Sequence, residues 1–234
     1  MALARVWWTL VRFGFRLLYN EMAWTYDLVS WVVSLGAWRS WQRAAIRYLN
    51  VPPGTCVLEL AHGTGNLQID MLTAGLTAVG LDLSPYMGRI ARRKLARLGI
   101  RADLVRGRGE HLPFPAGAFP AVVSTFPTEF IIAAETLREV YRVLQPDGRL
   151  VIVGNGRLTG GGIVAAVLEW AYRVTGQRAE WSGDLAQRFT GVGFRLWQAE
   201  VPCCRSVAFV LVAKKPAVVA EKPAPPVGIQ SGNP

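Results

Sequence analysis

Two carboxylates and a loop of small residues stand where a nucleotide cofactor could be bound. An apolar run that contains Glu59 leads into the loop Ala61-His62-Gly63-Thr64-Gly65, and a second apolar run ends at Asp82. Glycine lets the backbone approach a ligand closely, and a carboxylate after the second strand can accept hydrogen bonds from the hydroxyls of a ribose. The pattern therefore predicts a nucleotide-type cofactor site.

The spacing of the small residues decides between classes of cofactor. Dinucleotide-binding loops follow G-x-G-x-x-G, because the third glycine lets helix and strand pack closely. Counting from Ala61 places Asn66 at the third position, and counting from Gly63 places Gln68 there. Neither frame fits, so the loop is not a dinucleotide fingerprint.

Four blocks in order instead resemble the class I S-adenosylmethionine (SAM)-dependent methyltransferases. The small-x-Gly-x-Gly loop is similar to the first motif of that superfamily, and Gly80–Met87 is similar to its second. Its later blocks are matched by Leu112-Pro113-Phe114 with Phe119 and by Leu137–Leu150. The resemblance covers roughly residues 50–214, and it implies an enzyme that transfers methyl groups with SAM as cofactor.

The resemblance also implies which residues hold the cofactor. Glu59 would meet the methionyl ammonium group, Asp82 both ribose hydroxyls, and Leu83 with Met87 the adenine ring. His62 would line the cofactor or fill space in the loop. The full expected set is Tyr26, Glu59, Ala61, His62, Gly63, Gly65, Asp82, Leu83, Met87, Gly109, Glu110 and Thr125. No spacing of His and Cys suits a metal ion, so no metal site is expected.

Three positions depart from the superfamily pattern. Ala61 replaces a usual glycine, Pro120 an aspartate that opens the fourth strand, and Arg108 an aspartate that accepts from the adenine amino group. An arginine cannot accept a hydrogen bond, so Glu110 would take over that role while Gly109 offers its N–H to a ring nitrogen. The departures leave open a degenerate, non-catalytic SAM-binding protein.

The N-terminus has the pattern of an amphipathic helix. Arg5, Thr9, Arg12 and Arg16 form one polar stripe among Trp, Phe, Leu and Val. The arginines interrupt the apolar core of a signal peptide, and the longest apolar stretch, residues 28–38, is shorter than a transmembrane span. Residues 1–40 would either contact a membrane surface or pack on the domain as a lid. The expected location is the cytoplasm, with peripheral contact to the inner membrane face under the first interpretation.

A second resemblance narrows the acceptor. Tyr26-Asp27, the turn Ser34-Leu35-Gly36 and the segment Trp38–Arg43 resemble the N-terminal helices of the ubiquinone/menaquinone-biosynthesis C-methyltransferases. This implies a small lipophilic, quinol-like acceptor. The Arg-Asn motif of that family is replaced by Phe126–Phe130, and its Tyr-rich segment after the fifth strand is absent. A phospholipid amine therefore stays open as a variant of the acceptor.

The basic charge of the chain bears on its partners. The formal net charge is +10, with arginines at every fourth position from Arg39 to Arg47 and a second cluster between Arg89 and Arg108. Such clusters attract nucleic-acid phosphates or anionic lipids, or simply keep a surface solvated. An RNA methyltransferase is the alternative function. This chain lacks the Asn/Asp-Pro-Pro-aromatic motif that such enzymes carry after the fourth strand, so nucleic acid is not the expected partner. The sequence leaves the oligomeric state open.

An acceptor with a phenolic ring or an ammonium group must lose a proton during methylation. Glu129, just past the fourth strand, is the first candidate for the base that removes it, and His111 is the second.

The expected fold is a doubly wound, Rossmann-like α/β methyltransferase sheet, because apolar runs and helical segments alternate from Cys56 onward. Seven strands, mainly parallel, are expected near 56–60, 77–82, 102–106, 120–125, 148–154, 193–201 and 206–213. Helices are expected near 65–74, 85–98, 131–145, 163–175 and 182–190. The last two strands lack a helix between them and should form an antiparallel hairpin at the sheet edge. Extra N-terminal helices would occupy 1–49, the catalytic domain 50–215 and a disordered tail 216–234.

Overall fold

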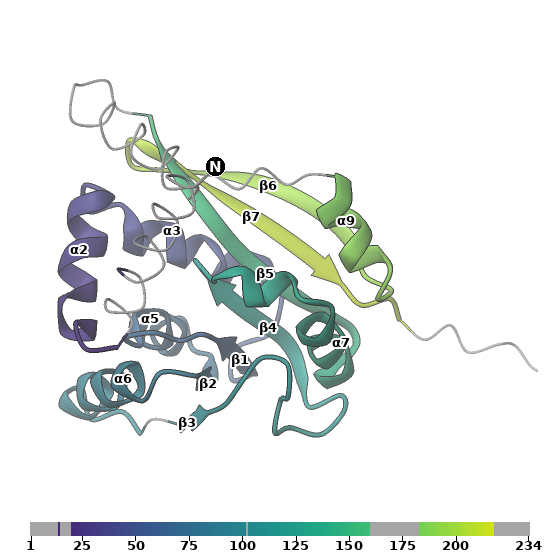
Figure 1. Cartoon of the computed structure of the whole chain (residues 1–234), viewed down its shortest axis with the longest axis horizontal. Coiled ribbons are helices and arrows are strands. Elements are labelled where there is room, and N and C mark those ends of the chain that lie inside the picture. Colours follow the sequence, from purple (N-terminus) through teal and green to yellow (C-terminus); the bar gives the residue numbers. More distant parts are fainter. Residues whose placement is uncertain (1–13, 15–19, 102, 160–182, 218–234) are drawn as a thin grey trace, which may run out of the picture.

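The computed structural model describes residues 14, 20–101, 103–159 and 183–217. A seven-stranded sheet runs through it in the order β3-β2-β1-β4-β5-β7-β6 (Figure 1). The strands are β1 (Cys56–Leu60), β2 (Thr77–Asp82), β3 (Asp103–Arg106), β4 (Phe119–Thr125), β5 (Leu144–Leu158), β6 (Arg195–Cys203) and β7 (Ser206–Lys214). The expected strands are confirmed, and β5 alone begins several residues early.

The pairing confirms the doubly wound sheet with a C-terminal hairpin. β1 pairs in parallel with β2 and β4, β2 with β3, and β4 with β5. β7 pairs antiparallel with both β5 and β6. The hairpin therefore forms one end of the sheet, with β7 inside and β6 at the edge.

A bulge opposite Pro120 accompanies the early start of β5. The pairing of β4 with β5 shifts register between Phe119 and Ala121, so that Gln145–Gly148 bulge opposite Pro120. A proline has no N–H to donate to a ladder. Asp147 takes a left-handed backbone, with φ of +66°, inside this bulge. The Asp147-Gly148 turn thus lies within the strand rather than before it.

Helices connect the parallel strands where the sequence predicts them. The helix expected at 65–74 is α5 (Asn66–Thr73), and that at 85–98 is α6 (Pro85–Arg97). The helix expected at 131–145 is divided into a 3₁₀ turn, η2 (Glu129–Ile132), and α7 (Ala134–Val143). The short helix near 182–190 is α9 (Gly183–Thr190), and the helix expected at 163–175 falls outside the described residues.

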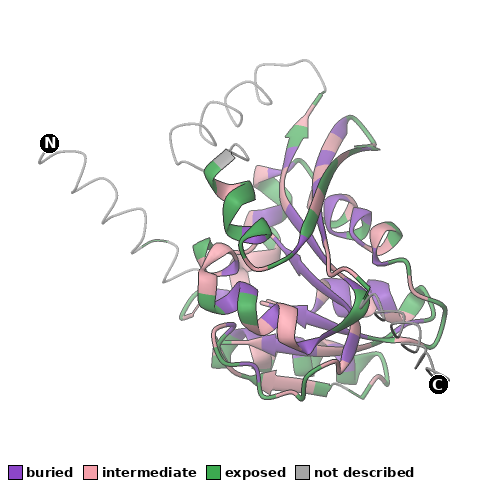
Figure 2. Cartoon of the chain, turned by 90° about the vertical axis from the view of Figure 1, so that its right-hand side faces the viewer, coloured by how far each residue is buried: buried purple, intermediate pink, exposed green. Residues whose placement is uncertain are grey.

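Both faces of the sheet are covered, because successive residues of the central strands belong to different core clusters. Val122 packs into a cluster with Leu137 of α7 and Phe189 of α9. Val123 packs on the other face, with Met71 of α5 and Trp41. Buried residues accordingly follow the strands and the helix sides that face them (Figure 2). Such two-sided burial is typical of parallel sheets.

The described part of the N-terminal region is helical. It consists of η1 (Ala23–Thr25), α2 (Tyr26–Val33), α3 (Trp38–Ala44) and α4 (Ile46–Leu49). Trp41 of α3 is buried and donates from Nε1 to Ser206 Oγ at 3.0 Å, and a Cβ on Gly156 would overlap its ring. The polar stripe predicted at Arg5, Thr9, Arg12 and Arg16 lies outside the described residues, as does the predicted tail beyond residue 217.

The arginines of α3 have a structural role. Arg39 donates from Nε and Nη2 to the two carboxylate oxygens of Asp70 on α5, at 3.1 and 3.0 Å, and Arg43 reaches Asp70 Oδ1 at 2.9 Å. Asp70 is buried, so these arginines compensate its charge. At least this pair of the clustered arginines holds two helices together. Of the described helices, none has the length and apolarity needed to cross a membrane.

Candidate functional site

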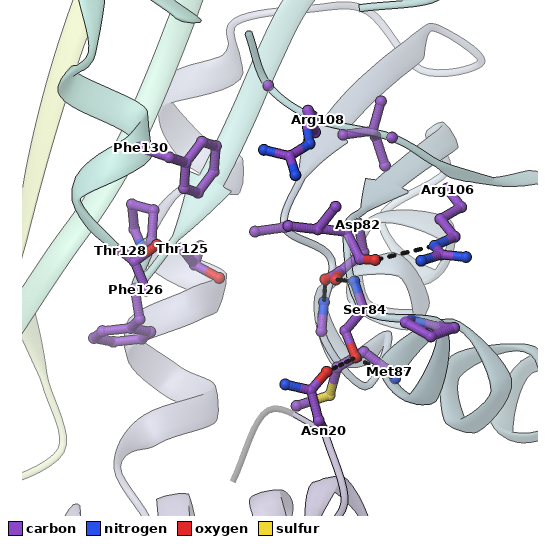
Figure 3. A pocket seen from close by; sticks show the side chains of 18 of the residues that line it. Asn20, Asp82, Ser84, Met87, Arg106, Arg108, Thr125, Phe126, Thr128 and Phe130 are labelled. Carbon is purple, nitrogen blue, oxygen red and sulfur yellow. Dashed lines mark hydrogen bonds between the residues drawn. The ribbon is translucent and has the colours of Figure 1, made fainter. Parts of the chain in front are cut away.

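A cavity of about 530 Å³ lies beyond the carboxyl ends of β1, β2, β3 and β4. This is where ligands bind in open α/β sheets. Residues from the ends of β2 and β4 face one another across it, with Arg108 near one end (Figure 3). Its walls are formed by Asn20, Tyr26, Ala61, Gly63, Leu81, Asp82, Leu83, Ser84, Pro85, Met87, Arg106, Gly107, Arg108, Gly109, Glu110, Thr125, Phe126, Pro127, Thr128 and Phe130.

Asp82 is the carboxylate that lines this cavity at the end of β2. Its Oδ2 accepts from the N–H of Gly63 at 2.9 Å, and its Oδ1 accepts from the N–H of Ser84 at 2.8 Å. Each carboxylate oxygen can accept a second hydrogen bond. Asp82 is therefore fixed by backbone on one side and can accept from a ligand hydroxyl on the other.

The small-residue loop takes a left-handed backbone at three places. Ala61, Gly63 and Gly65 have φ of +56°, +54° and +81°. Ala61 and Gly63 line the cavity, so the residue that departs from the usual glycine still adopts the backbone that glycine would favour. That conformation costs a residue with a Cβ about 1 kcal/mol or more.

Gly65 has a different role from the other two. It does not line the cavity, and a Cβ there would lie 3.0 Å from the Cβ of Ala91 on α6. The glycine thus lets the start of α5 approach α6. Gly65 thus has a packing role in this structure, and its contact with the cofactor stays a prediction.

Glu59 and His62 also lie behind the cavity wall rather than on it. Glu59 is 1% exposed; its Oε2 accepts from Gln68 Nε2 at 2.6 Å, and its Oε1 has no partner. Burial raises the pKa of Glu59 to about 8, assisted by the charges of Asp82 and Asp70 and opposed by the Gln68 hydrogen bond. Near neutral pH, Glu59 therefore holds a proton in the folded chain.

His62 fills the space that a missing side chain leaves. A Cβ on Gly80 would lie 2.9 Å from His62 Cδ2, and the His62 Nδ1 lies 2.9 Å from the carbonyl of Gly63. Burial lowers the pKa of His62, against the opposing charge of Asp82. A neutral, enclosed imidazole supports the space-filling alternative for this residue.

Two arginines stand at the end of the cavity that the sequence assigns to adenine. Arg108 is exposed and lines the wall together with Gly109 and Glu110. Arg106 lines it too, and its Nε donates to the carbonyl of Leu83 at 3.3 Å. Arg106 was not predicted as a site residue; it ends β3, at the edge of the sheet where ligands bind.

Asp27 holds the N-terminal helices against the glycine loop. Its Oδ1 accepts from Thr64 Oγ1 at 2.6 Å and from Asn66 Nδ2 at 3.0 Å, and its Oδ2 pairs with Lys94 Nζ at 2.7 Å. Burial alone would raise the pKa of Asp27, but these three donors outweigh it and hold the pKa below its ordinary value. This clamp sets Tyr26 into the cavity wall, where the sequence predicts it.

The opposite wall follows β4. Thr125, as predicted, lines the cavity, and its Oγ1 accepts from Gln42 Nε2 at 3.1 Å. Phe126 has a left-handed φ of +50° and stacks on Trp38 with ring centroids 3.8 Å apart. Phe126, Thr128 and Phe130 were not predicted as site residues, because an aromatic segment in a loop carries no specific signal.

The two candidate bases do not line the cavity. Glu129 begins the 3₁₀ turn η2 and is exposed, and its neighbour Phe130 lines the wall instead. His111 pairs with Arg108 across a tight bridge and is exposed as well. The ionisable side chains on the described wall are Tyr26, Asp82, Arg106, Arg108 and Glu110. Glu129 and His111 therefore stay predictions as bases, and neither lines this cavity.

The fold is shared with solved methyltransferase structures. A SAM-dependent methyltransferase from Methanosarcina mazei is 17% identical with a TM-score of 0.52, covering 74% of this chain and 97% of the other. Phosphoethanolamine N-methyltransferase 2 from Haemonchus contortus, in complex with SAM, is 14% identical with a TM-score of 0.57, covering 77% and 53%. These likenesses concern the fold.

Sequence relatives are more specific. A demethylmenaquinone methyltransferase from Thermus thermophilus is 37% identical over 139 residues, covering 58% of this chain and 63% of that protein. A ubiquinone/menaquinone biosynthesis C-methyltransferase from Escherichia fergusonii is 32% identical over 142 residues, covering 58% and 57%. The chain thus spans less than two thirds of the length of these relatives. A family model, described as the ubiE/COQ5 methyltransferase family, matches residues 15–180. Since that match covers more than half of the chain, the chain belongs to the ubiE/COQ5 methyltransferase family.

Proposed function

We propose that the chain binds SAM in the described cavity and methylates a small lipophilic, quinol-type acceptor at a membrane surface. The observation that carries this proposal is the Asp82 carboxylate, which faces the cavity at the end of β2 and is held by the N–H groups of Gly63 and Ser84. The names of the relatives from Thermus thermophilus and Escherichia fergusonii support a quinone-type acceptor.

The residues present suit the cofactor. Asp82 would accept from the ribose hydroxyls, Ala61 and Gly63 would bring backbone close to the ligand, and Leu83 would cover the adenine. A volume of about 530 Å³ lies within the range of small-molecule sites. SAM supplies an electrophilic methyl group when it is bound. Glu59 would act indirectly, from behind the wall, as a buried carboxyl group that accepts a hydrogen bond from Gln68 under the loop.

The remaining wall suits an apolar acceptor. Phe126, Pro127 and Phe130 present apolar surface next to the hydroxyls of Thr125 and Thr128. A ring carbon that gains a methyl group must give up one proton. We infer that water takes this proton and that the Tyr26 hydroxyl positions that water, because Tyr26 lines the cavity and Glu129 and His111 do not.

The test of the function is the fate of a labelled methyl group. When the full chain is incubated with methyl-labelled SAM and a bacterial lipid extract, the label should enter the organic phase in a quinone-type product. Label in a phospholipid would replace the proposed acceptor with an amine, and label confined to RNA or to water-soluble products would overturn the proposal.

Arg108 should weaken the cofactor site, so that its replacement improves binding. Arg108→Asp is expected to tighten SAM binding about tenfold, because the new carboxylate can accept from the adenine amino group where a guanidinium cannot. Isothermal titration calorimetry measures this gain directly.

Arg101→Asp is the matched control for this change. It alters net charge equally at a side chain that is 94% exposed and pairs only loosely with Asp103, at 3.7 Å. Equal SAM affinities for wild type, Arg108→Asp and Arg101→Asp would remove Arg108 from the adenine site.

A further inference from the structure

Helix α2 is amphipathic, but its apolar side faces solvent and its polar side faces the protein. Its apolar side chains point to solvent: Trp24, just before the helix, is 76% exposed, and Leu28 and Trp31 are 63% and 62% exposed. The residues turned toward the protein are the small or polar Ala23, Ser30 and Ser34. We call the exposed apolar set the aromatic face; it comprises Met22, Trp24, Leu28, Trp31, Val32 and Leu35.

The side of α2 that faces the protein makes polar contacts. The Ser34 hydroxyl donates to the carbonyl of Ser30 at 2.7 Å and accepts from the N–H of Trp38 at 2.9 Å. Asp27 binds the glycine loop and Lys94. Because the polar side of the helix makes these bonds, its apolar side is left outward. Contiguous exposed apolar surface of this kind marks an interaction site.

A row of positive charge lies on α6, the helix that an ion pair joins to α2. Arg89, Arg93 and Arg97 are exposed and spaced by four residues, so they share one side of α6. We call them the arginine stripe. Lys94, beside the stripe, reaches across to Asp27 and joins α6 to α2. The two helices lie together at one margin of the molecule (Figure 1).

Charge decides which partner suits this surface. Tryptophans and aliphatic side chains bordered by arginines match the boundary between headgroups and acyl chains of an anionic bilayer. A two-fold contact with a second copy would bring this basic surface against itself, since an isologous interface repeats the same patch. In the segment 20–35, the acidic residues are Glu21 and Asp27, and Lys94 already pairs with Asp27.

We propose that the aromatic face and the arginine stripe together dock the protein on an anionic bilayer. Tyr26 lines the cavity from the side of α2 opposite to Leu28 and Trp31, so α2 would lie between the docked lipid and the cavity. This inference deepens the proposed function by naming the surface that meets the membrane, and it is tested without methyl transfer.

Vesicle flotation of the full chain tests the surface. Vesicles of phosphatidylcholine with roughly a third phosphatidylglycerol should bind the protein, and vesicles of phosphatidylcholine alone should bind it at least about tenfold more weakly. The double substitution Trp24→Ser/Trp31→Ser should reduce binding to the anionic vesicles about tenfold or more. Arg89→Gln/Arg93→Gln/Arg97→Gln should do the same and remove most of the salt dependence.

Matched controls lie on the opposite edge of the sheet. Trp197→Ser on β6 removes a tryptophan that is 37% exposed, and Arg195→Gln removes an exposed arginine of the same strand. Both should bind vesicles as the wild type does. SAM affinity, measured by calorimetry without lipid, should be unchanged in all of these variants.

The outcomes are separable. Wild-type binding by the tryptophan double variant would overturn the proposal, whatever the N-terminal segment contributes. If the wild type is a dimer that does not bind vesicles, and the same double variant is a monomer, the aromatic face would be assigned to a second copy instead. Failure of the wild type to bind SAM would contradict the proposed function and leave the vesicle result standing.

Discussion

Asp82→Ala is expected to weaken SAM binding about a hundredfold, because two hydrogen bonds from ribose hydroxyls to a charged acceptor are lost. Titration calorimetry of the purified chain measures this effect. Asp103→Ala, a change of the same charge at an exposed position on β3, should leave the affinity unchanged.

The carboxylate also holds the loop, and a second measurement separates these roles. Asp82→Ala leaves the N–H groups of Gly63 and Ser84 without their acceptor, so some loss could come from a displaced loop. Asp82→Asn keeps one acceptor oxygen. In a double-mutant cycle, removing the ribose hydroxyls from the ligand should weaken its binding to the wild type. The same removal should weaken its binding to Asp82→Asn much less. Equal losses in both proteins would refute the ribose contact.

Glu59 is expected to make the stability of the chain fall with rising pH. In the unfolded chain its carboxyl ionises near pH 4.5, whereas in the folded chain burial raises the pKa to about 8. Between these values the folded state holds the extra proton, so the free energy of unfolding decreases as pH rises from about 4.5 to about 8. Glu59 should lower the free energy of unfolding by about 1 kcal/mol per pH unit, and by roughly a few kcal/mol over the whole window.

Urea unfolding of the wild type and Glu59→Gln between pH 5 and pH 9 isolates this contribution. Glutamine keeps the volume and does not titrate, so the variant should gain relative stability as pH rises and should equal or exceed the wild type above pH 8. Parallel pH profiles would show that Glu59 titrates normally. Glu135→Gln, at an exposed position on α7, is the control and should not change the slope.

The sheet was predictable because its signals are local. Each central strand is a short apolar run with burial on both faces, and Ser84 with Pro85 marks the start of α6 as capping chemistry requires. The bulge opposite Pro120 was not predicted, since it depends on which strand lies beside β4. Propensity describes a segment, whereas register describes a pair of segments.

The site was predictable where the backbone dictates it and not where side-chain direction does. Asp82 and Gly63 reach the cavity because strand ends and their loops converge there, and Tyr26 reaches it from α2. Glu129 is one residue from a wall position, but a 3₁₀ turn directs Phe130 inward and leaves Glu129 exposed. Glu59 sits at the predicted strand end yet faces Gln68 beneath the loop. Whether a side chain lines the cavity, is buried or faces solvent therefore depends on the local direction of the chain, which can differ between adjacent residues.

The position of β7 has a consequence for how the chain is made. A ribosome delivers β5 well before β7, and β5 keeps one open edge until residues 206–214 arrive to pair with it. That edge belongs to a strand of 15 residues, and unpaired edges of this length invite association with other chains. The sheet is therefore completed only after β7 has emerged. Premature termination before residue 206 should yield an aggregating product rather than a smaller soluble domain.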